Sequence, residues 1–383
     1  MARRRPNLPE LHWRRKNHFR LLANGDQFFP EMLGAIASAR RQILLELYLF
    51  ESGRVADRFV SALGAAASRG VDVRVIIDAF GSLALSSPDR ETLSRAGVKL
   101  HVYNPLQVLG DRVRNLARDH RKLLVIDGKR AFVGGTGITD EFSPEASPDS
   151  YWRETMLDIR GPVVGDWARL FAQVWTGGGN PAFRVASARE AVAGGTQAGR
   201  VAIAHGLNVQ DVQHHALDAI RVARRRVWLS TPYFLPSMRM RRELARAARR
   251  GVEVRLILPG SHTDHPLLRM ASHHYYAGLL RHGIHIHEYQ PRFIHSKTLL
   301  VDDWCSIGSC NFDRWNLRWN LEANQEVQDA VFAREVAAML EKDILCSVRI
   351  EPEDWAGRLP VISRLEEGLA NGGQAIERFL DRL

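Results

Sequence analysis

Cysteine is scarce in this 383-residue chain, which has only Cys305, Cys310 and Cys346. An odd number without metal-ligand spacing argues against a disulfide framework and favours a reducing, cytoplasmic setting. Long hydrophobic runs are also missing, because the apolar stretch Gln42–Phe50 is interrupted by Glu46 and is shorter than the roughly 18 residues of a membrane span. The basic N-terminus lacks the apolar segment of a secretory signal. We therefore expect any membrane contact to be peripheral.

Lysine is scarce as well, at six of the 53 basic residues, so arginine supplies most of the positive charge. The formal net charge is +10, and 45% of the residues are apolar, which is enough for a sizeable core. Such a positive field favours phosphate-bearing partners, either nucleic acid or an anionic membrane surface. Charge alone does not choose between these two kinds of partner.

The chain repeats itself in its two halves. Ala39–Phe50 (ARRQILLELYLF) is matched by Ala223–Phe234 (ARRRVWLSTPYF), and Arg69–Asp78 (RGVDVRVIID) is matched by Arg250–Pro259 (RGVEVRLILP). A third pair, AGVKLHVYN and HGIHIHEYQ, follows in the same order. We therefore interpret the chain as two tandem copies of one unit.

Each copy is expected to alternate helices with short buried strands. The apolar runs have the length of strands, and the segments before them carry helical spacing, which predicts an α/β sheet with helices on its faces. The small, glycine-rich segment Ala186–Gly199 (ASAREAVAGGTQAG) is the expected linker. We therefore place the units at residues 20–184 and 200–345, followed by a C-terminal appendage at residues 346–383.

One motif, His-x-Lys-x4-Asp, occurs in both copies. Its residues are His120, Lys122 and Asp127 in the first copy and His295, Lys297 and Asp302 in the second. Side chains alternate along a strand, so each His and Lys share a face, whereas the Asp seven residues after the His has the opposite parity. Asp127-Gly128 also predicts a tight hairpin turn. We expect the His/Lys pairs to carry the chemistry and the aspartates to brace the hairpins.

Phosphodiester transfer without a metal needs a nucleophile, a general acid and fixed positive charge for the phosphoryl oxygens. Two histidines and two lysines supply this set, whereas one motif supplies half of it. We therefore expect the two units to pack about a pseudo-twofold axis, with a single active site at their interface.

The motifs, together with Gly308-Ser309-Cys310-Asn311 after the second one, resemble the phospholipase D superfamily. The first copy departs from the pattern, because Gly137 stands where that family usually has asparagine. Four further segments resemble cardiolipin synthases, above all the short form without membrane spans called cardiolipin synthase B. They are NGDQFFPEMLGAIASARRQILLELYLF from Asn24, IDAFGS from Ile77, YWRETMLDIRGPVV from Tyr151 and NLEAN from Asn320.

This resemblance implies transfer of a phosphatidyl group from phosphatidylglycerol or another phospholipid to the hydroxyl of a second phosphatidylglycerol, releasing glycerol. It further implies a phosphohistidine-type intermediate, no metal and no other cofactor. His120 is then assigned as the nucleophile and His295 as the general acid and base, with the reverse order left open. The supporting residues that it implies are Lys122, Lys297, Asn311 and Ser309 near the phosphoryl group, and Glu322 and Glu154 beside the histidines.

The expected partners are lipid substrates and an anionic membrane, at the cytoplasmic side of a bacterial inner membrane, and no nucleic acid is expected. Three alternatives stay open: a phospholipase D that uses water as acceptor, a nuclease of the same superfamily, which the basic charge favours, and a binding module without catalysis. The identity of the donor and of the acceptor, and the oligomeric state, are not specified by the sequence.

Several other residues have two interpretations each. Glu46 either pairs with an arginine or reaches the rim of the active site, because an unpaired carboxylate in an apolar strand is costly. Tyr233 and Phe234 either line a lipid channel or belong to the core. The segment Leu106–Arg118 is either an amphipathic element at a membrane surface or a solvated loop.

The N-terminal arginines, Trp13 and Phe19 suit anionic headgroups, or else form part of a disordered tail. Seven histidines crowd one stretch of the second copy without the spacing of a standard ligand set, so metal binding is not expected there. They are His262, His265, His273, His274, His282, His285 and His287.

Overall fold

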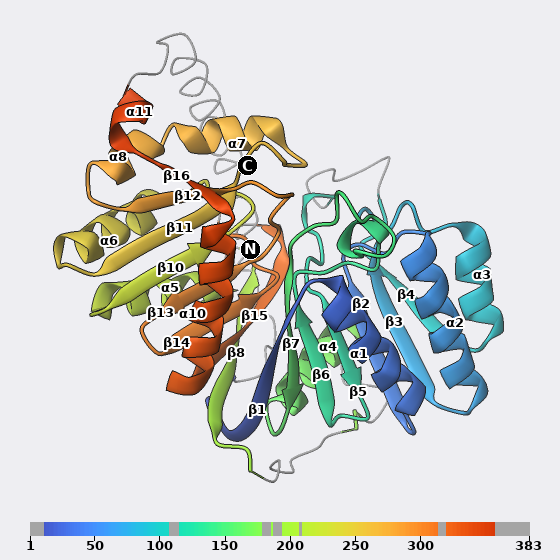
Figure 1. The fold of residues 1–383 in the computed structure, drawn as a ribbon. Helices are drawn as coiled ribbons and strands as arrows, with labels where there is room; N and C mark the ends of the chain where they lie inside the picture. The colour runs from blue at the N-terminus through green and yellow to red at the C-terminus, as the bar shows by residue number, and fades with distance from the viewer. Residues whose placement is uncertain are drawn as a thin grey trace, which may run out of the picture.

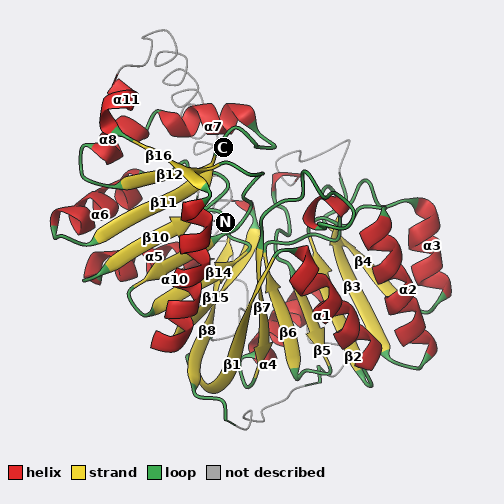
Figure 2. Cartoon of the chain, in the orientation of Figure 1, coloured by secondary structure: helices red, strands yellow, loops and turns green. Residues whose placement is uncertain are grey.

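The computed structural model describes residues 11–106, 115–177, 185–186, 194–206, 209–312 and 319–356. Within these ranges, sixteen strands form one mixed sheet, and helices lie on both of its faces (Figure 2). The two halves of the chain lie side by side, with β1, β7, β8 and β15 between them (Figure 1). The α/β class expected from the sequence is confirmed.

The strands of the first half are β1 (Arg14–Ala23), β2 (Gln42–Leu47), β3 (Asp72–Asp78), β4 (Lys99–Tyr103), β5 (Leu123–Ile126), β6 (Arg130–Gly134) and β7 (Thr155–Arg160). The strands of the second half are β8 (Gln197–His205), β9 (Val209–Gln210), β10 (Arg226–Ser230), β11 (Glu253–Pro259), β12 (His285–Tyr289), β13 (Thr298–Val301), β14 (Trp304–Gly308), β15 (Leu321–Gln328) and β16 (Ser347–Ile350).

The helices of the first half are α1 (Gly25–Ser38), α2 (Arg54–Ser68), α3 (Ser87–Arg95), the 3-10 turn η2 (Asp140–Phe142) and α4 (Val164–Trp175). The helices of the second half are α5 (Asp211–Val222), α6 (Met238–Arg249), α7 (Pro266–His273), α8 (Tyr276–Leu280), α10 (Ala330–Leu345) and α11 (Pro352–Ala356). None of the helices in the described ranges is both long enough and apolar enough to cross a membrane.

The order of the strands across the sheet shows the internal duplication. Outward from the central pair β1 and β8, the first half runs β7, β6, β5, β2, β3, β4, and the second half runs β15, β14, β13, β10, β11, β12. In both series the last three strands are parallel, because helices connect them, and the others are antiparallel. The three repeats found in the sequence correspond to β2 and β10, β3 and β11, and β4 and β12, so the duplication is confirmed.

Three apolar clusters hold these layers together. One packs α1 and α2 on one face of the first half, and another packs α5 and α6 on one face of the second half. In α2, Phe59 and Leu63 follow helical spacing and are fully buried. The third cluster joins both halves, because α4 and α10 cover the opposite face; in it the Phe19 and Phe332 ring centroids lie 6.1 Å apart. The two halves therefore share one continuous core.

Strand β1 corrects one expectation from the sequence. Phe19 is 3% exposed within the shared core, so it is not available to bind lipid headgroups. Trp13 is partly exposed and lies under the Arg200 guanidinium, 4.8 Å from the ring centroid. Of the N-terminal arginines, Arg14 pairs with Asp166 at 3.0 Å, whereas those within residues 1–10 lie outside the described residues. Residues 187–193 of the expected linker and residues 107–114 of the segment Leu106–Arg118 also lie outside them.

The proposed unit boundaries stay a prediction. Strand β1 begins before residue 20 and pairs with both β7 and β8. The expected C-terminal appendage begins with β16, which extends the sheet beside β12. Residues 357–383 lie outside the described part of the chain.

Asp127 and Asp302 each stand at the turn of a hairpin, at the end of β5 or β13 remote from the histidine. Both adopt a positive φ, 52° and 51°. Asp127 accepts three backbone N–H groups of residues 40–42 at 2.7–3.0 Å. Asp302 accepts the equivalent three of residues 224–226 at 2.9–3.0 Å. Each carboxylate therefore ties its hairpin to the start of the neighbouring strand, which agrees with the bracing role expected from strand parity.

We expect Asp302→Ala to destabilise the fold by about 1–3 kcal/mol at about pH 7, because three backbone donors lose a charged acceptor. Burial alone would raise the pKa of Asp302, but these N–H groups lower it below its usual value. Its contribution is therefore present above the unfolded pKa of about 3.9 and is lost as the pH falls through the folded value. Urea unfolding of the variant and the parent at several pH values measures the effect.

Asp303→Ala is the matched control, because Asp303 is a half-buried neighbour whose carboxylate pairs with the more exposed Arg225 at 2.6 Å. We expect this change to stay within about 0.5 kcal/mol. Equal losses for the two variants would contradict the bracing role of Asp302.

Candidate active site

Two short backbone bridges bring the motifs of the two halves together. The His120 N–H donates to Leu321 O at 2.9 Å, and the Leu321 N–H donates to Arg118 O at 2.8 Å. The second half repeats this arrangement, because His295 donates to Arg153 O and Arg153 donates to Phe293 O, both at 2.8 Å. The segment before each motif is thereby paired with the start of the central strand of the other half.

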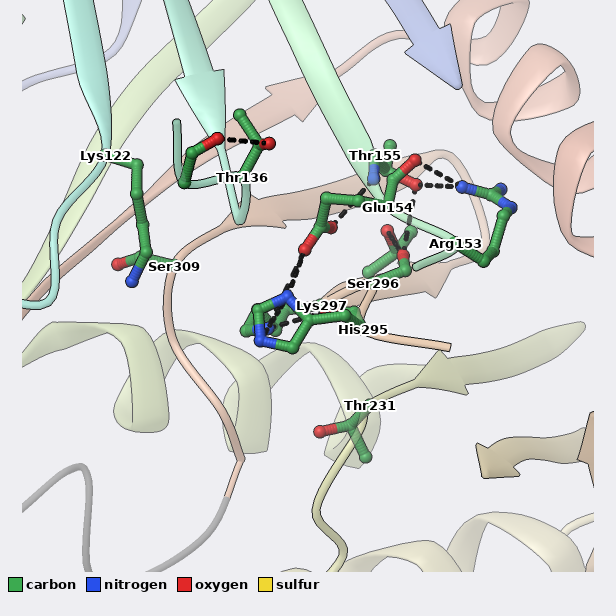
Figure 3. Close-up of polar contacts among 12 residues, drawn as sticks. Lys122, Thr136, Arg153, Glu154, Thr155, Thr231, His295, Ser296, Lys297 and Ser309 are labelled. Carbon is green, nitrogen blue, oxygen red and sulfur yellow. Dashed lines mark hydrogen bonds and ion pairs between the residues drawn. The ribbon is translucent and has the colours of Figure 1, made fainter. Parts of the chain in front are cut away.

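Each histidine faces a buried glutamate of the opposite half. His120 Nδ1 lies 2.8 Å from Glu322 Oε1, and His295 Nδ1 is hydrogen-bonded to Glu154 Oε2 at 2.5 Å. Figure 3 shows Glu154 pointing toward the His295 ring. The register of β6 on β7 and of β14 on β15 makes the two glutamates equivalent. Because Nδ1 of each ring is directed at a carboxylate, we assign Nε2 as the nitrogen that meets a substrate, and at His295 this nitrogen lies 2.9 Å from Lys297 Nζ.

The two motif lysines occupy equivalent positions beside the rings. Lys122 Nζ donates to His120 O, and Lys297 Nζ donates to His295 O, both at 2.6 Å. Lys297 Nζ also lies 2.9 Å from His295 Nε2 and 3.8 Å from Glu154 Oε2. The Lys297 ammonium group is therefore held next to the His295 ring nitrogens, and the Lys122 ammonium group is held at the His120 backbone carbonyl. Both lysines can neutralise a phosphoryl group bound between the two motifs.

Burial of these six groups shifts their protonation. Burial, followed by the charges of Lys122 and Lys297, lowers the pKa of both histidines well below the usual value. Burial raises the pKa of Glu154 to about 7 and of Glu322 to about 8. It lowers the pKa of Lys122 to about 7 and of Lys297 to about 8. Several groups of the site therefore titrate near neutral pH, as groups that transfer protons must.

The two glutamates are supported differently. Ser309 Oγ donates to Glu322 Oε2 at 2.5 Å, whereas the equivalent residue in the first half is Gly135. A Cβ on Gly135 would clash with the Glu154 carboxylate, which instead accepts the Thr155 N–H at 2.7 Å. A serine at position 135 would therefore displace Glu154.

The two halves also differ at Gly137, which stands where the second half has Asn311. A Cβ at this position would lie 2.6 Å from the Leu49 Cβ, so an asparagine does not fit. Its counterpart Asn311 is 2% exposed and lines the cavity, and its Oδ1 has no hydrogen-bond partner among the described residues. One motif asparagine is thus presented to the cavity, from the second half.

A cavity of about 540 Å³ opens onto both histidines. Its described lining consists of Tyr48, Leu49, His120, Lys122, Trp152, Tyr233, Leu235, Asp264, His265, Leu268, His295, Asn311 and Asn320. The Tyr48 ring lies 4.8 Å from His120, and the Trp152 ring lies 5.2 Å from His295, centroid to centroid. Apolar and aromatic walls around two His/Lys pairs suit a substrate that joins a phosphate to apolar groups.

Sequence reasoning missed several residues of this wall, among them Tyr48, Asp264 and Asn320. Tyr48 and Asp264 follow β2 and β11, and because the carboxyl ends of parallel strands meet at one edge of a sheet, this placement could have identified them. Tyr233 lines the cavity, as the first interpretation of this pair expected. Phe234 is 2% exposed and belongs to the core, as the second interpretation expected.

Glu46 does pair with an arginine. Its Oε1 lies 2.8 Å from Arg121 Nε, and Asp119 Oδ1 lies 3.5 Å from the same nitrogen. Burial raises the pKa of Glu46 well above the usual value. Glu46 is not part of the cavity lining among the described residues, so the pairing interpretation is confirmed and the rim interpretation is wrong.

A second buried ion pair supports the site from behind. Arg153 donates through Nε and Nη2 to the two carboxylate oxygens of Asp343 on α10, both at 2.9 Å. Its remaining nitrogen donates to Glu154 O at 2.5 Å and to Thr155 Oγ1 at 3.0 Å. The residue before Glu154 is thereby fixed to a helix of the other half.

The crowded histidines of the second half have separate surroundings. His265 lines the cavity, and His273 is buried and bonds Glu288 at 3.1 Å. In the described ranges, no group of three or more His, Cys, Asp or Glu side chains is placed to hold a metal ion.

The fold and the paired His/Lys site define a protein of the phospholipase D class. A family model described as cardiolipin synthase, PLD-like domain, matches residues 32–175 and 216–344, which together make up most of the chain. The chain therefore belongs to the PLD-like family of cardiolipin synthases.

Curated relatives agree with this membership. Cardiolipin synthase A of Pseudomonas aeruginosa PAO1 is 34% identical over 339 residues, which cover 88% of this chain and 69% of that protein. Cardiolipin synthase B of Salmonella typhimurium LT2 is 35% identical over 327 residues, which cover 84% of this chain and 78% of that protein. The corresponding enzyme of Escherichia coli K12 is 34% identical over 331 residues, with the same coverage.

Solved structures support the fold. Phosphatidylserine synthase of Haemophilus influenzae Rd KW20 superposes with a TM-score of 0.71 at 12% identity, over 96% of both chains. Polyphosphate kinase of Porphyromonas gingivalis gives a TM-score of 0.55 at 17% identity, over 85% of this chain and 50% of that one. At these identities the likeness concerns the fold alone.

We expect Glu322→Gln to lower turnover about 100-fold without lowering the thermal midpoint. The amide keeps the shape of the side chain but removes the ionisable carboxyl group that orients the His120 ring and can carry a negative charge as the ring becomes positive. A carboxylate whose pKa is raised by burial disfavours folding when it ionises, so its replacement does not lower the thermal midpoint. Turnover on phospholipid vesicles and thermal unfolding are measured on the same sample.

Glu326→Gln is the matched contrast, four residues along the same strand. Glu326 is equally buried, but it pairs with Arg200 at 2.6 Å and with His215 at 2.8 Å, outside the cavity. We expect this change to lower the thermal midpoint and to leave turnover per folded molecule unchanged. If Glu322→Gln lowered the thermal midpoint and Glu326→Gln lowered turnover instead, an orienting role for Glu322 would be ruled out.

Proposed function

We propose that this chain is a cardiolipin synthase that transfers a phosphatidyl group between two phosphatidylglycerol molecules. The observation that carries the proposal is the pairing of each cavity histidine with a buried glutamate of the opposite half. This arrangement gives one phosphorus atom a nucleophile on one side and a proton donor on the other. Membership of the cardiolipin synthase family supports the choice of lipid over nucleic acid.

In the first step, His120 Nε2 attacks the phosphorus of the donor lipid, and the bond from phosphorus to the glycerol headgroup oxygen breaks. His295 gives its proton to this oxygen, so that glycerol leaves as a neutral alcohol. The products are a phosphatidyl group on His120 and a neutral His295. The aligned lysines and the Asn311 amide hold the phosphoryl oxygens as charge moves onto them.

In the second step, a hydroxyl of another phosphatidylglycerol attacks the same phosphorus. His295 accepts the hydroxyl proton, the bond from phosphorus to His120 breaks, and cardiolipin leaves. Both histidines have then regained their initial protonation. Two phosphatidylglycerol molecules have become one cardiolipin and one glycerol, with no other reactant required.

The buried glutamates set the protonation and the charge of the two histidines during these steps. The hydrogen bond of 2.5 Å between His295 and Glu154, whose pKa is raised by burial to about 7, lets the pair hold one proton near neutral pH. A bound phosphodiester adds a negative charge to the cavity and thereby favours the protonated ring. Glu322 in turn stabilises the positive charge that develops on His120 during attack.

We infer that the enzyme acts as a peripheral protein on the cytoplasmic side of a bacterial inner membrane. The net charge of +10 favours an anionic lipid surface. The cavity wall of tyrosine, tryptophan and leucine suits a lipid near its phosphate.

Purified protein on phosphatidylglycerol vesicles tests the proposed reaction. We expect cardiolipin and glycerol in equal amounts, and we expect His120→Ala and His295→Ala each to reduce product at least 1,000-fold, because each ring has a separate role. Phosphatidic acid as the sole product would indicate a hydrolase, and cleavage of DNA but not lipid would indicate a nuclease. Unchanged activity of both variants would rule out the histidine mechanism.

We expect a bell-shaped dependence of kcat/KM on pH, with a maximum between about pH 6 and 8. As the pH falls, His120 gains a proton and loses the lone pair with which it attacks. As the pH rises, the pair of His295 and Glu154 loses its proton, and Lys122, whose pKa burial lowers to about 7, loses its charge. A flat profile between about pH 5 and 9, with chemistry rate-limiting, would contradict these roles.

A further inference from the structure

One side chain of the cavity does not suit a phosphate. Asp264 follows β11 and lines the cavity together with both histidines, and its side chain is 20% exposed. A carboxylate offers only acceptors and repels a phosphodiester, so it does not assist the phosphoryl group held by the lysines. A neutral ligand group that carries O–H donors would suit it.

Asp264 belongs to a small polar cluster. The Tyr233 hydroxyl donates to Asp264 Oδ2, and His265 Nε2 lies 3.8 Å from the same oxygen. Tyr233 and His265 also line the cavity, with their ring centroids 5.6 Å apart. The tyrosine hydroxyl fixes the carboxylate and can itself accept a further hydrogen bond.

This cluster lies on the His295 side of the cavity. The Tyr233 ring centroid is 6.3 Å from that of Phe293, which is 5.8 Å from that of His295. The charge of Asp264 also acts to raise the pKa of Lys297, although burial dominates and lowers it. The acceptor group is therefore placed beside the second motif.

No equivalent of this cluster is found among the described residues of the first half. Its described lining residues are Tyr48, Leu49, His120, Lys122 and Trp152, none of which is acidic. The acid at the corresponding strand end, Asp78, is fully buried and accepts the backbone N–H groups of Phe80, Gly81 and Asp119. The cavity is thus nearly symmetric in its His, Lys and Glu groups and asymmetric in its hydroxyl acceptors.

Asn311 adds a second acceptor to the same cavity. Its side chain is almost completely buried, and its Oδ1 has no hydrogen-bond partner among the described residues. The amide can donate to a phosphoryl oxygen through Nδ2 and accept a ligand hydroxyl through Oδ1. A ligand with a phosphate and adjacent hydroxyls satisfies both atoms.

We propose that Asp264, held by Tyr233, binds the free hydroxyl groups of the glycerol headgroup on the His295 side of the cavity. This inference rests on the proposed function and deepens it. The alcohol leaves, and the next alcohol enters, beside His295, which is where the acid and base of the transfer must act. The subsite therefore assigns His295 to the alcohol and His120 to the phosphorus.

A competition between two acceptors tests this subsite. Wild type, Asp264→Asn and Tyr233→Phe are given phosphatidylglycerol vesicles with radiolabelled glycerol and 1-propanol at equal concentrations, and both phosphatidyl products are quantified. We expect the wild type to prefer glycerol, and Asp264→Asn to lower the ratio of glycerol to propanol product about tenfold, because a site built to bond a hydroxyl loses its acceptor. Tyr233→Phe shifts the ratio in the same direction by a smaller factor.

The ratio compares two products of the same enzyme, so a loss of folded protein does not change it. Asp218→Asn is the control, because Asp218 is an exposed acid on α5 that pairs with Arg221, and it leaves the ratio unchanged. An unaltered ratio in Asp264→Asn, or an equal fall in both products, would overturn the subsite. Failure of the proposed function is seen separately, as a wild type that forms no cardiolipin without added alcohol.

Discussion

The pairing of each catalytic histidine with a glutamate of the opposite half is the interaction on which the site depends. Neither half contains a complete His–Glu pair, since Glu154 serves His295 and Glu322 faces His120. The crossed pairs form only because the segments before the motifs are hydrogen-bonded to the starts of β7 and β15 across the interface. Continuity of the sheet through β1 and β8, and a core shared by α4 and α10, hold these bridges in register.

Burying so many ionisable groups in one site opposes folding. The site buries two lysines, two glutamates and His295 and leaves the His120 side chain only 12% exposed, and burial disfavours the charged form of each group. The opposing shifts bring the pKa values of the lysines and glutamates together, to about 7 or 8. The same desolvation that opposes folding therefore makes the groups able to exchange protons near neutral pH.

The duplicated halves have diverged where the chemistry needs two different roles. Ser309 supports Glu322, whereas Gly135 makes room for Glu154; Asn311 faces the cavity, whereas Gly137 packs on Leu49. A pseudo-twofold cavity with identical halves would give the two histidines identical surroundings and no reason to differ. The hydrogen-bond acceptors of the second half, Asp264 and Asn311, favour binding of the alcohol beside His295. Glu322 then faces the attacking ring of His120, and Glu154 faces the proton-transferring ring of His295.

The sequence by itself determined the duplication, the α/β class and the two motifs, because strand and helix periodicity and motif spacing are local properties of the chain. It also predicted that the aspartates turn away from the His/Lys pairs, since side chains alternate along a strand. Only the tertiary structure decided which glutamate faces which histidine, why position 137 is glycine and that Phe19 is core. It also placed Asp264 in the cavity. Each of these facts depends on contacts between segments that are remote in the chain and meet only when β1 and β8 join the two halves of the sheet.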